Sequence, residues 1–383
     1  MSELRTHSLR HNTATGDANI EMYADGSTSI RNLQNFAKSL VINGAMAVAQ
    51  RGVEETDVLA AGYHCVDRMR YSVTQLATLR TTISQSTDSP AGFSHSWKVE
   101  VTTTQAAGDD SGVRLQYRVE GRDMQHLDWG TANAKSLSVS FWVRSSVAGD
   151  YSLTLYRDEA TDRNIGTTFT ITADEASNNT WKLITHTFPG DQTTAVTDDE
   201  ACRLELTISM TAGTDFRATN NTSWDNYATG RYAFGHTANF TASVNSTFYV
   251  TGLQITPTDA PIEFQHETYG ETLAKCQRYY TFMRSGIPAT STFTLFAIGR
   301  GNTGTNARFA VPHPVTMRAT PALSSSGAFT CAGGAVTSMS TTHSSPWVSQ
   351  LSVNRASGMT ASDAVELRAN DDTDARLIFN AEL

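Results

Sequence analysis

The sequence predicts a mainly β protein with an antiparallel β-sandwich at its centre, and two observations lead to this fold class. Apolar and polar residues alternate with a period of two in several separate stretches, as in strands that bury one face. Only 17% of the residues are charged, and the apolar residues come in short runs separated by Ser, Thr, Gly and Asn, a mixture typical of strands and turns. A chain of 383 residues is long enough for two or three domains that each bury a core.

The clearest alternation lies within residues 51–265, which we expect to form the sandwich domain. Four stretches place an apolar residue at every second position, namely Leu137–Val143, Tyr151–Leu155, Leu204–Met210 and Phe248–Val250. One apolar face on each strand implies two sheets packed face to face. Turn signals such as Ala148-Gly149-Asp150 separate the strands.

Residues 1–50 are expected to contain a β-hairpin followed by a short helix or linker. The stretch Ile20–Ile30 reads as two short strands around Asp25-Gly26, a dipeptide that favours a tight turn. An isolated hairpin is marginally stable in water, so this one should need a partner surface. The apolar run Leu40-Val41-Ile42 should then lead into the first core.

One helix is expected to link the sandwich to a second domain, over residues 266–285. Thr268 and Glu271 have the spacing of a capping box. An apolar stripe at intervals of three or four residues follows them, formed by Leu273, Cys276, Tyr280 and Met283. Strand-like runs return after Gly286, so residues 286–383 should form a smaller C-terminal β-sandwich domain.

Charge and hydropathy exclude two classes of partner. The formal net charge of -9 provides no clustered basic surface for nucleic acid or for an anionic membrane. The N-terminus lacks the apolar region of a signal peptide, and no window approaches the length of a membrane span. We therefore expect neither nucleic-acid binding nor membrane insertion.

Motifs for catalysis, metals and cofactors are incomplete, so we expect a protein that is not an enzyme, with no catalytic residue, metal ligand or cofactor. Gly299, Gly301 and Gly304 match G-x-G-x-x-G, but the following residues read as extended where a dinucleotide site needs a helix. His266-Glu267 begins a zinc-protease motif, yet position 270 is Gly. The acidic turns, such as Asp371-Asp372, are expected to be solvated loops.

The four cysteines are scattered and form no C-x-x-C pair. This spacing indicates neither a zinc ribbon nor a dense disulfide framework. We expect free, reduced thiols.

An Asn-rich loop, residues 220–227, is the expected ligand-facing surface, because loops often carry recognition residues. We assign ligand binding to Trp224, Asn226 and Tyr227. Other aromatic side chains could stack on sugar rings, but core or subunit packing is the more ordinary role for each of them. Trp142 lies opposite the apolar face of its strand, so it should be exposed, covered by a second subunit or buried beneath a loop.

Several segments resemble a known family of phage tail-fibre and other virion proteins, particularly those of marine phages. The most specific is Cys276-Gln277-Arg278-Tyr279-Tyr280, within the expected helix. The others, in the family's order over residues 38–383, are the runs at 40–46, 113–121, 129–132, 138–143, 248–255 and 309–318. The N-terminal pieces Leu9-Arg10-His11-Asn12 and Ala24-Asp25-Gly26 are similar to segments by which such proteins dock to the particle.

The resemblance implies a jelly-roll-type sandwich in a structural virion protein, synthesised in the host cytoplasm and commonly trimeric. The leading interpretation is a tail fibre or spike for host attachment, and the alternatives are a capsid-mounted head fibre or decoration protein, or a carbohydrate-binding module without catalysis. The implied partners are two further copies of the chain, other tail or capsid proteins through residues 1–50, and a glycan of the host surface. The family pattern carries no catalytic site.

Overall fold

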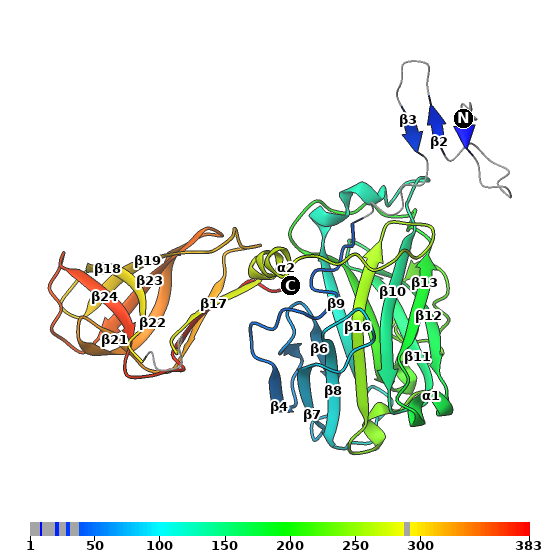
Figure 1. Ribbon diagram of the computed structural model, residues 1–383, viewed down its shortest axis with the longest axis horizontal. Coiled ribbons are helices and arrows are strands. Elements are labelled where there is room, and N and C mark those ends of the chain that lie inside the picture. Colours follow the sequence, from blue (N-terminus) through cyan, green and yellow to red (C-terminus); the bar gives the residue numbers. More distant parts are fainter. Residues whose placement is uncertain (1–7, 10–19, 23–27, 31–37, 287–291) are drawn as a thin grey trace, which may run out of the picture.

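The computed structural model describes residues 8–9, 20–22, 28–30, 38–286 and 292–383. The fold is mainly β with antiparallel sheets, as the sequence predicts. Figure 1 shows a large two-sheet sandwich, a smaller β lobe beside it, and the helix α2 where the two meet. Within the described residues, no helix is long and apolar enough to cross a membrane.

The sandwich consists of a six-stranded sheet and a seven-stranded sheet. The six-stranded sheet has the order β13 (Lys182–Phe188), β10 (Leu137–Ser145), β16 (Thr247–Thr256), β8 (Ser96–Thr103), β7 (Arg80–Ser86), β4 (Glu54–Val58). The seven-stranded sheet has the order β15 (Asp225–Asn226), β12 (Arg163–Ile171), β11 (Gly149–Arg157), β14 (Cys202–Ala212), β9 (Gly112–Glu120), β6 (Arg70–Thr74), β5 (Gly62–Tyr63). Strands β8 to β11 pass alternately from one sheet to the other, as in a jelly roll.

Short helices occupy the connections of the sandwich. They are η2 (Gly121–Leu127), α1 (Ala173–Ser177), η3 (Thr214–Phe216), η4 (Thr229–Arg231) and η5 (Phe240–Ala242). The last three belong to one long connection between β14 and β16. This connection covers the outer face of the seven-stranded sheet.

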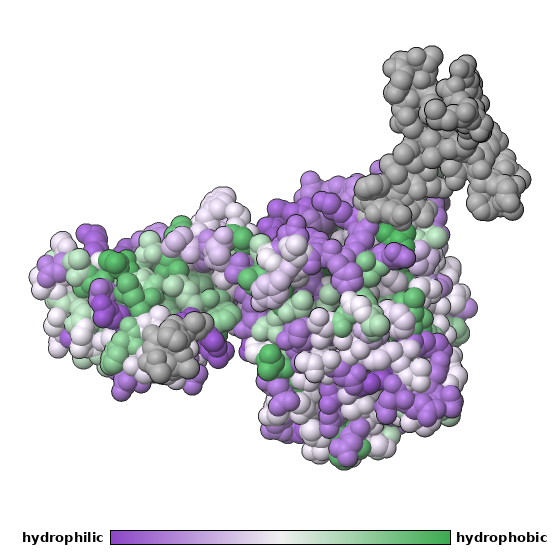
Figure 2. Space-filling view, viewed as in Figure 1, coloured by the Kyte–Doolittle hydropathy of each residue, from purple (hydrophilic) through white to green (hydrophobic). Residues whose placement is uncertain are grey.

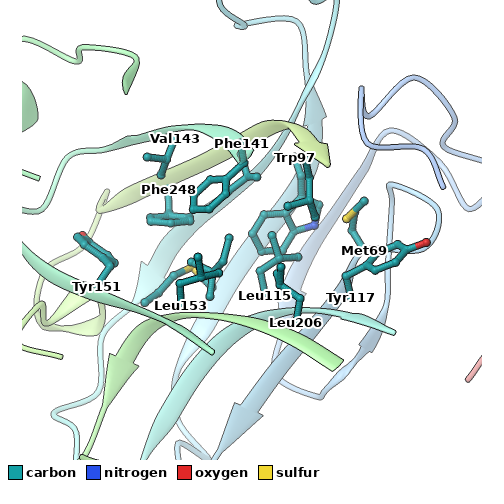
Figure 3. Packing of buried hydrophobic residues seen from close by; sticks show 14 of the residues in the cluster. Met69, Trp97, Leu115, Tyr117, Phe141, Val143, Tyr151, Leu153, Leu206 and Phe248 are labelled. Carbon is teal, nitrogen blue, oxygen red and sulfur yellow. The ribbon is translucent and has the colours of Figure 1, made fainter. Parts of the chain in front are cut away.

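The period-two alternation fills the space between the two sheets. The four alternating apolar residues of β10, from Leu137 to Val143, are completely buried, and their partners on the facing sheet include Leu115 and Leu206. Figure 3 shows Phe141, Trp97 and Phe248 pointing from one side toward Leu115, Leu153 and Leu206 on the other. Burial of this continuous apolar layer is the main stabilising contribution to the sandwich.

Residues 38–48 form part of the sandwich, whereas we expected them to belong to the N-terminal segment, residues 1–50. β8 pairs with β16 only as far as Val250, which leaves the backbone of the second half of β16 without a neighbour on that side. Residues 38–48 take this place: Leu40 N–H donates to Ile255 O (2.8 Å), and Leu253 N–H donates to Gly44 O (3.0 Å). Met46 and Val48 are fully buried, so the boundary of the sandwich lies near residue 38.

The N-terminal strands form a small sheet of their own. β1 (Ser8–Leu9), β2 (Ile20–Met22) and β3 (Thr28–Ile30) are antiparallel, and Ile20 pairs with Ile30. The two strands of the expected hairpin are thus confirmed. Its turn, Asp25-Gly26, lies outside the described residues.

The linking helix has the expected start but a much earlier end. Thr268 and Glu271 form a capping box at the beginning of α2 (Tyr269–Gln277). The prediction of a helix to residue 285 was wrong, since the chain continues as β17 (Tyr280–Arg284), which pairs with β25 (Arg376–Asn380). Aromatic and β-branched residues in Tyr280–Arg284 favour a strand, and the available edge of β25 satisfies its backbone.

The C-terminal part is β, as expected, but its strands close on themselves instead of forming two open sheets. A three-stranded sheet, in the order β17, β25 and β20 (Ala322–Ser326), leads into a closed six-stranded barrel. The barrel has the order β18 (Leu295–Gly301), β19 (Asn306–Pro312), β23 (Val348–Arg355), β22 (Gly334–Ser344), β21 (Phe329–Cys331), β24 (Ala364–Ala369). Phe309, Leu351 and Leu367 fill its interior.

Two glycines explain why the barrel can close tightly. A Cβ atom at Gly299 would overlap the carbonyl oxygen of Arg308, and one at Gly301 would overlap that of Thr360. Glycine in a strand often marks such a close backbone approach. The G-x-G-x-x-G match therefore lies in the hairpin of β18 and β19, and the prediction of a loop or hairpin here is confirmed.

A first prediction concerns the docking of residues 38–48 against β16. A Cβ at Gly44 would overlap the carbonyl oxygen of Leu253, so Gly44→Ala should lower the free energy of unfolding by about 1–3 kcal/mol through overpacking. The matched control is Gly270→Ala, where a Cβ meets nothing within 4 Å and alanine favours the helix. Urea denaturation measures both variants, and equal stability for the two would contradict the proposed docking.

Candidate functional site

The connection 213–246 covers the outer face of the seven-stranded sheet, and Tyr232 lies at the centre of this cover. The Tyr232 hydroxyl donates to Glu205 Oε1 (3.0 Å) and accepts from Gln116 Nε2 (2.9 Å). Thr154 Oγ1 donates to the Tyr232 carbonyl oxygen (2.8 Å). Burial raises the pKa of the Tyr232 hydroxyl, so it stays protonated and acts as a hydrogen-bond donor. The polar face of this sheet is therefore used to hold the chain's own loop.

Arg231 fixes the part of the loop that we expected to bind a ligand. Its guanidinium donates to Asn164 Oδ1 (3.1 Å), to Asn220 O (2.5 Å) and to Ser223 O (2.8 Å). The side chain is 6% exposed. A buried guanidinium with several carbonyl partners is a structural anchor, because an unpaired one would be costly.

The three predicted ligand residues have separate partners within the protein. Trp224 Nε1 donates to Pro189 O (2.7 Å), and its ring meets Trp129 edge-on at 5.5 Å between centroids. Asn226 is exposed on β15 and accepts a hydrogen bond from Arg163 (3.3 Å). The Tyr227 ring packs edge-on against Tyr156 at 5.2 Å. The structure therefore places all three in the loop cover, with Trp224 and Tyr227 contributing to packing.

A second polar cluster connects the sandwich to the C-terminal part, and Glu120 is its central charge. Glu120 lies at the end of β9 and is completely buried. Its carboxylate accepts hydrogen bonds from Arg278 Nη2 (2.8 Å) and from the Tyr279 hydroxyl (2.5 Å). Arg278 and Tyr279 belong to Cys276–Tyr280, the segment with the most specific resemblance to virion proteins. This segment thus makes polar contacts across the boundary between the sandwich and the C-terminal part.

Arg68 extends this cluster on the sandwich side. Its guanidinium pairs with Glu382 and donates to Arg118 O (2.7 Å). It also lies over the Tyr279 ring, 3.5 Å from the centroid. Because the side chain is only 1% exposed, these contacts take the place of water at the Nη atoms, and the cation–π contact is stronger than at an exposed site.

Arg51 makes the corresponding contacts to the next tyrosine. Its guanidinium lies 3.7 Å from the centroid of the Tyr280 ring and pairs with Glu382 (3.0 Å) and Asp67 (3.3 Å). Gln50 Nε2 donates to Tyr280 O (2.8 Å). We call the set Arg51, Arg68, Glu120, Arg278, Tyr279, Tyr280 and Glu382 the junction network.

The chemistry of the junction network is that of a structural connection. Burial raises the pKa of the Tyr279 hydroxyl and of the Cys276 thiol, so both stay protonated and neither is a nucleophile. The charged members are paired with opposite charges. Across the described ranges, no three His, Cys, Asp or Glu side chains are grouped so that they could hold a metal ion.

Sequence reasoning identified the Cys-Gln-Arg-Tyr-Tyr segment but not its partners. Glu120 and Arg68 are a carboxylate and a guanidinium in strand-rich sequence, and no local pattern marks them as buried.

The acidic turn at Asp372 has a structural role. The carboxylate of Asp372 accepts hydrogen bonds from the N–H groups of Ala328 and Asp374, both at 2.7 Å, which lowers its pKa. The four cysteines are free.

The barrel carries an apolar strip on its outer surface. Pro312 pairs with Val348 across β19 and β23, and Ile298 lies on β18, the strand on the other side of β19. Ile298, and Trp347 directly before Val348 in the chain, are each 64% exposed. Figure 2 shows hydrophobic residues at the surface of this lobe. Where exposed apolar residues gather on a surface, they often mark an interaction site.

Comparisons with known proteins find no matching family and no matching curated protein. Among solved structures, the enzymatically active domain of tailspike protein 4 of bacteriophage CBA120 aligns with 57% of this chain at 10% identity and a TM-score of 0.31. The alignment spans 21% of the tailspike chain.

Carbohydrate-binding modules are also found. A family 11 module from Clostridium thermocellum, in complex with a β-1,3-1,4-mixed-linked tetrasaccharide, aligns over 54% of this chain and 96% of its own, at 12% identity and a TM-score of 0.26. TmCBM61, in complex with β-1,4-galactotriose, aligns over 58% and 100%, at 8% identity and a TM-score of 0.29. Likenesses of this strength assign neither ligand nor activity to this chain.

A second prediction tests the junction network. Arg278→Met keeps the side-chain stem but leaves the buried carboxylate of Glu120 without its main cationic partner. The free energy of unfolding should therefore fall by about 3–5 kcal/mol. Arg122 also lies near Glu120 (3.5 Å), but it is 44% exposed. Arg122→Met should therefore change stability by less than about 1 kcal/mol. Urea denaturation compares the two variants, and similar losses would contradict a special role for Arg278.

A third prediction concerns pH and the loop cover. His236 Nδ1 accepts from Ser152 N–H (3.3 Å), and its Nε2–H donates to Ala238 O (2.8 Å), so the ring is neutral. Burial lowers the pKa of His236 to about 4, below the value of about 6.5 in the unfolded chain. The unfolded chain therefore binds a proton first as the pH falls, and the stability contributed by His236 is lost between pH 6.5 and 4.

The measurement is the free energy of unfolding at several pH values for the wild type and for His236→Asn. The wild type should lose more stability than the variant between pH 6.5 and 4. An identical pH dependence would show that His236 does not titrate in this way.

Proposed function

We propose that this chain is a non-catalytic structural component of the outer surface of a bacteriophage particle, namely a tail fibre or spike that takes part in host attachment. The observation that carries the proposal is the role of Cys276–Tyr280. The segment with the most specific resemblance to virion proteins is the one that connects the sandwich to the C-terminal part through Glu120 and Arg68.

The use of ionisable groups supports a mechanical role. An enzyme places perturbed acids or bases in a cleft where a substrate can reach them. Here the strongly perturbed tyrosine and cysteine side chains, such as Tyr279 and Cys276, lie within packed interfaces and stay protonated. A fibre must transmit force between its parts, and a buried junction in which opposite charges are paired suits that task.

The N-terminal segment is proposed to attach the chain to other tail or capsid proteins. β1, β2 and β3 pair with one another, and such a small sheet needs a partner surface for stability. A capsid-mounted head fibre or decoration protein would use the same arrangement, and this remains the alternative within the class.

We further propose that the chain forms a homotrimer in which the apolar strip on the barrel is covered by a neighbouring copy. Ile298, Pro312, Trp347 and Val348 expose apolar surface that a monomer would leave in water. A partner copy brings the same neutral, apolar surface and needs no compensating charge.

The fourth prediction uses light scattering on the full chain and on residues 38–383, since residues 38–48 belong to the sandwich. Both proteins should have three times the mass of one chain. Ile298→Asp should lower the mass, because it places a charge in the covered strip. Leu59→Asp is the matched control, since Leu59 is 50% exposed on the sandwich, and it should leave the trimer unchanged. Stable monomers of both proteins would contradict the fibre or spike proposal.

A further inference from the structure

A pocket of about 410 Å³ lies where three segments meet at the end of the sandwich nearest α2. The segments are residues 38–47, the connection before β8 at 92–95, and residues 264–272, which include the start of α2. The volume falls within the range of about 300–1,000 Å³ that is usual for small-molecule sites. The pocket is remote from the loop residues 224–227, which belong to the other sheet.

Three aromatic rings form one wall of the pocket. Phe93 lies 5.0 Å from Phe264 and 5.2 Å from His266, and Phe264 lies 4.8 Å from His266, measured between ring centroids. The ring planes meet at 69°, 41° and 71° respectively. Rings at such angles leave no parallel slot for a planar ligand such as a nucleobase. They instead form one cluster of edge-to-face and tilted rings.

The aromatic wall continues onto the outer face of the six-stranded sheet. Gly252 has a φ of +61°, and a Cβ there would lie 2.7 Å from Phe93 Cζ and 3.2 Å from Trp142 Cδ1. Phe93 and Trp142 therefore lie close together above Gly252. Trp142 is half-buried beside Phe93. The sequence allowed this side chain to be exposed, covered by a second subunit or buried beneath a loop, and the third of these positions agrees best with the structure.

The rest of the lining is polar but carries little net charge. Ser94 and His95 line the pocket, and the Nδ1 atom of His95 is buried without a hydrogen-bond partner in the described part of the chain. Buried polar atoms are usually paired, so a ligand hydroxyl could complete this one. The carboxylate of Glu267 is already paired with Lys275. Among the lining residues, this leaves Lys38 as the one unpaired charge. A phosphate or sulfate site needs more cationic groups than this.

We propose that this pocket binds a neutral pyranose unit of a glycan. A pyranose has apolar C–H faces and hydroxyl groups around its edge, which matches an aromatic wall beside polar groups. The proposal names the ligand of the adhesive role proposed above and rests on it. It assigns that ligand to Phe93, Phe264 and His266 and not to Trp224, Asn226 and Tyr227.

The fifth prediction uses saturation-transfer NMR and calorimetry with neutral methyl glycosides of glucose, galactose, N-acetylglucosamine and rhamnose. At least one should bind, with the strongest transfer to the ring C–H protons. Phe93→Leu keeps an apolar side chain but removes the ring, and His266→Ala removes a second ring at an exposed position. Each should weaken binding at least tenfold without changing the thermal midpoint of unfolding.

Two control variants locate the site. Val244→Ala removes an exposed apolar side chain from the sandwich and should leave binding unchanged, and so should Asn226→Ala in the loop. Loss of binding in Asn226→Ala but not in Phe93→Leu would overturn the proposal in favour of the loop. Binding only of phosphorylated or sialylated probes, or of none, would also overturn it. Failure here leaves the trimer mass unaffected, so it is distinct from failure of the proposed function.

Discussion

The arrangement of the two β parts depends on one buried carboxylate, that of Glu120. A fully buried charge costs several kcal/mol unless it is paired and hydrogen-bonded. Glu120 belongs to the sandwich, but Arg278 and Tyr279, which satisfy it, belong to the segment that leads into the barrel. Its burial is therefore tolerable only when the two parts have this relative position. We infer that the junction network fixes geometry more than it adds stability, since a buried ion pair gains little over apolar packing.

Segments that adjoin the junction network in the chain shape the proposed pocket. Residues 38–48 pair with β16, and the segment before α2 supplies Phe264 and His266. A pocket bounded by fixed backbone on several sides is preorganised, which lowers the entropic cost of binding. The outer face of the other sheet is closed by Tyr232, Arg231 and the rest of their loop. The outer face of the six-stranded sheet is thus left open at the end where residues 38–48 meet the segment before α2.

Sequence reasoning found what depends on local periodicity. The alternation in β10 and the capping box at Thr268 and Glu271 are local signals, and both appear in the structure as expected. The end of α2 was missed because the fate of Tyr280 depends on pairing with a strand about a hundred residues later. Trp224 looked like a ligand residue because its contact with Trp129 is nonlocal. The burial of Glu120 is likewise set by residues more than 150 positions away, which no single-sequence pattern encodes.

The central claim is that the sandwich and the barrel are held in one fixed arrangement. The most direct test is a distance distribution from pulsed electron resonance, with spin labels at Thr102 on β8 and Thr337 on β22, both exposed. The unsubstituted chain controls for reaction of the native cysteines, three of which are buried. We expect a single narrow distribution that broadens in Arg278→Met. A broad distribution in the otherwise unaltered chain would contradict the account.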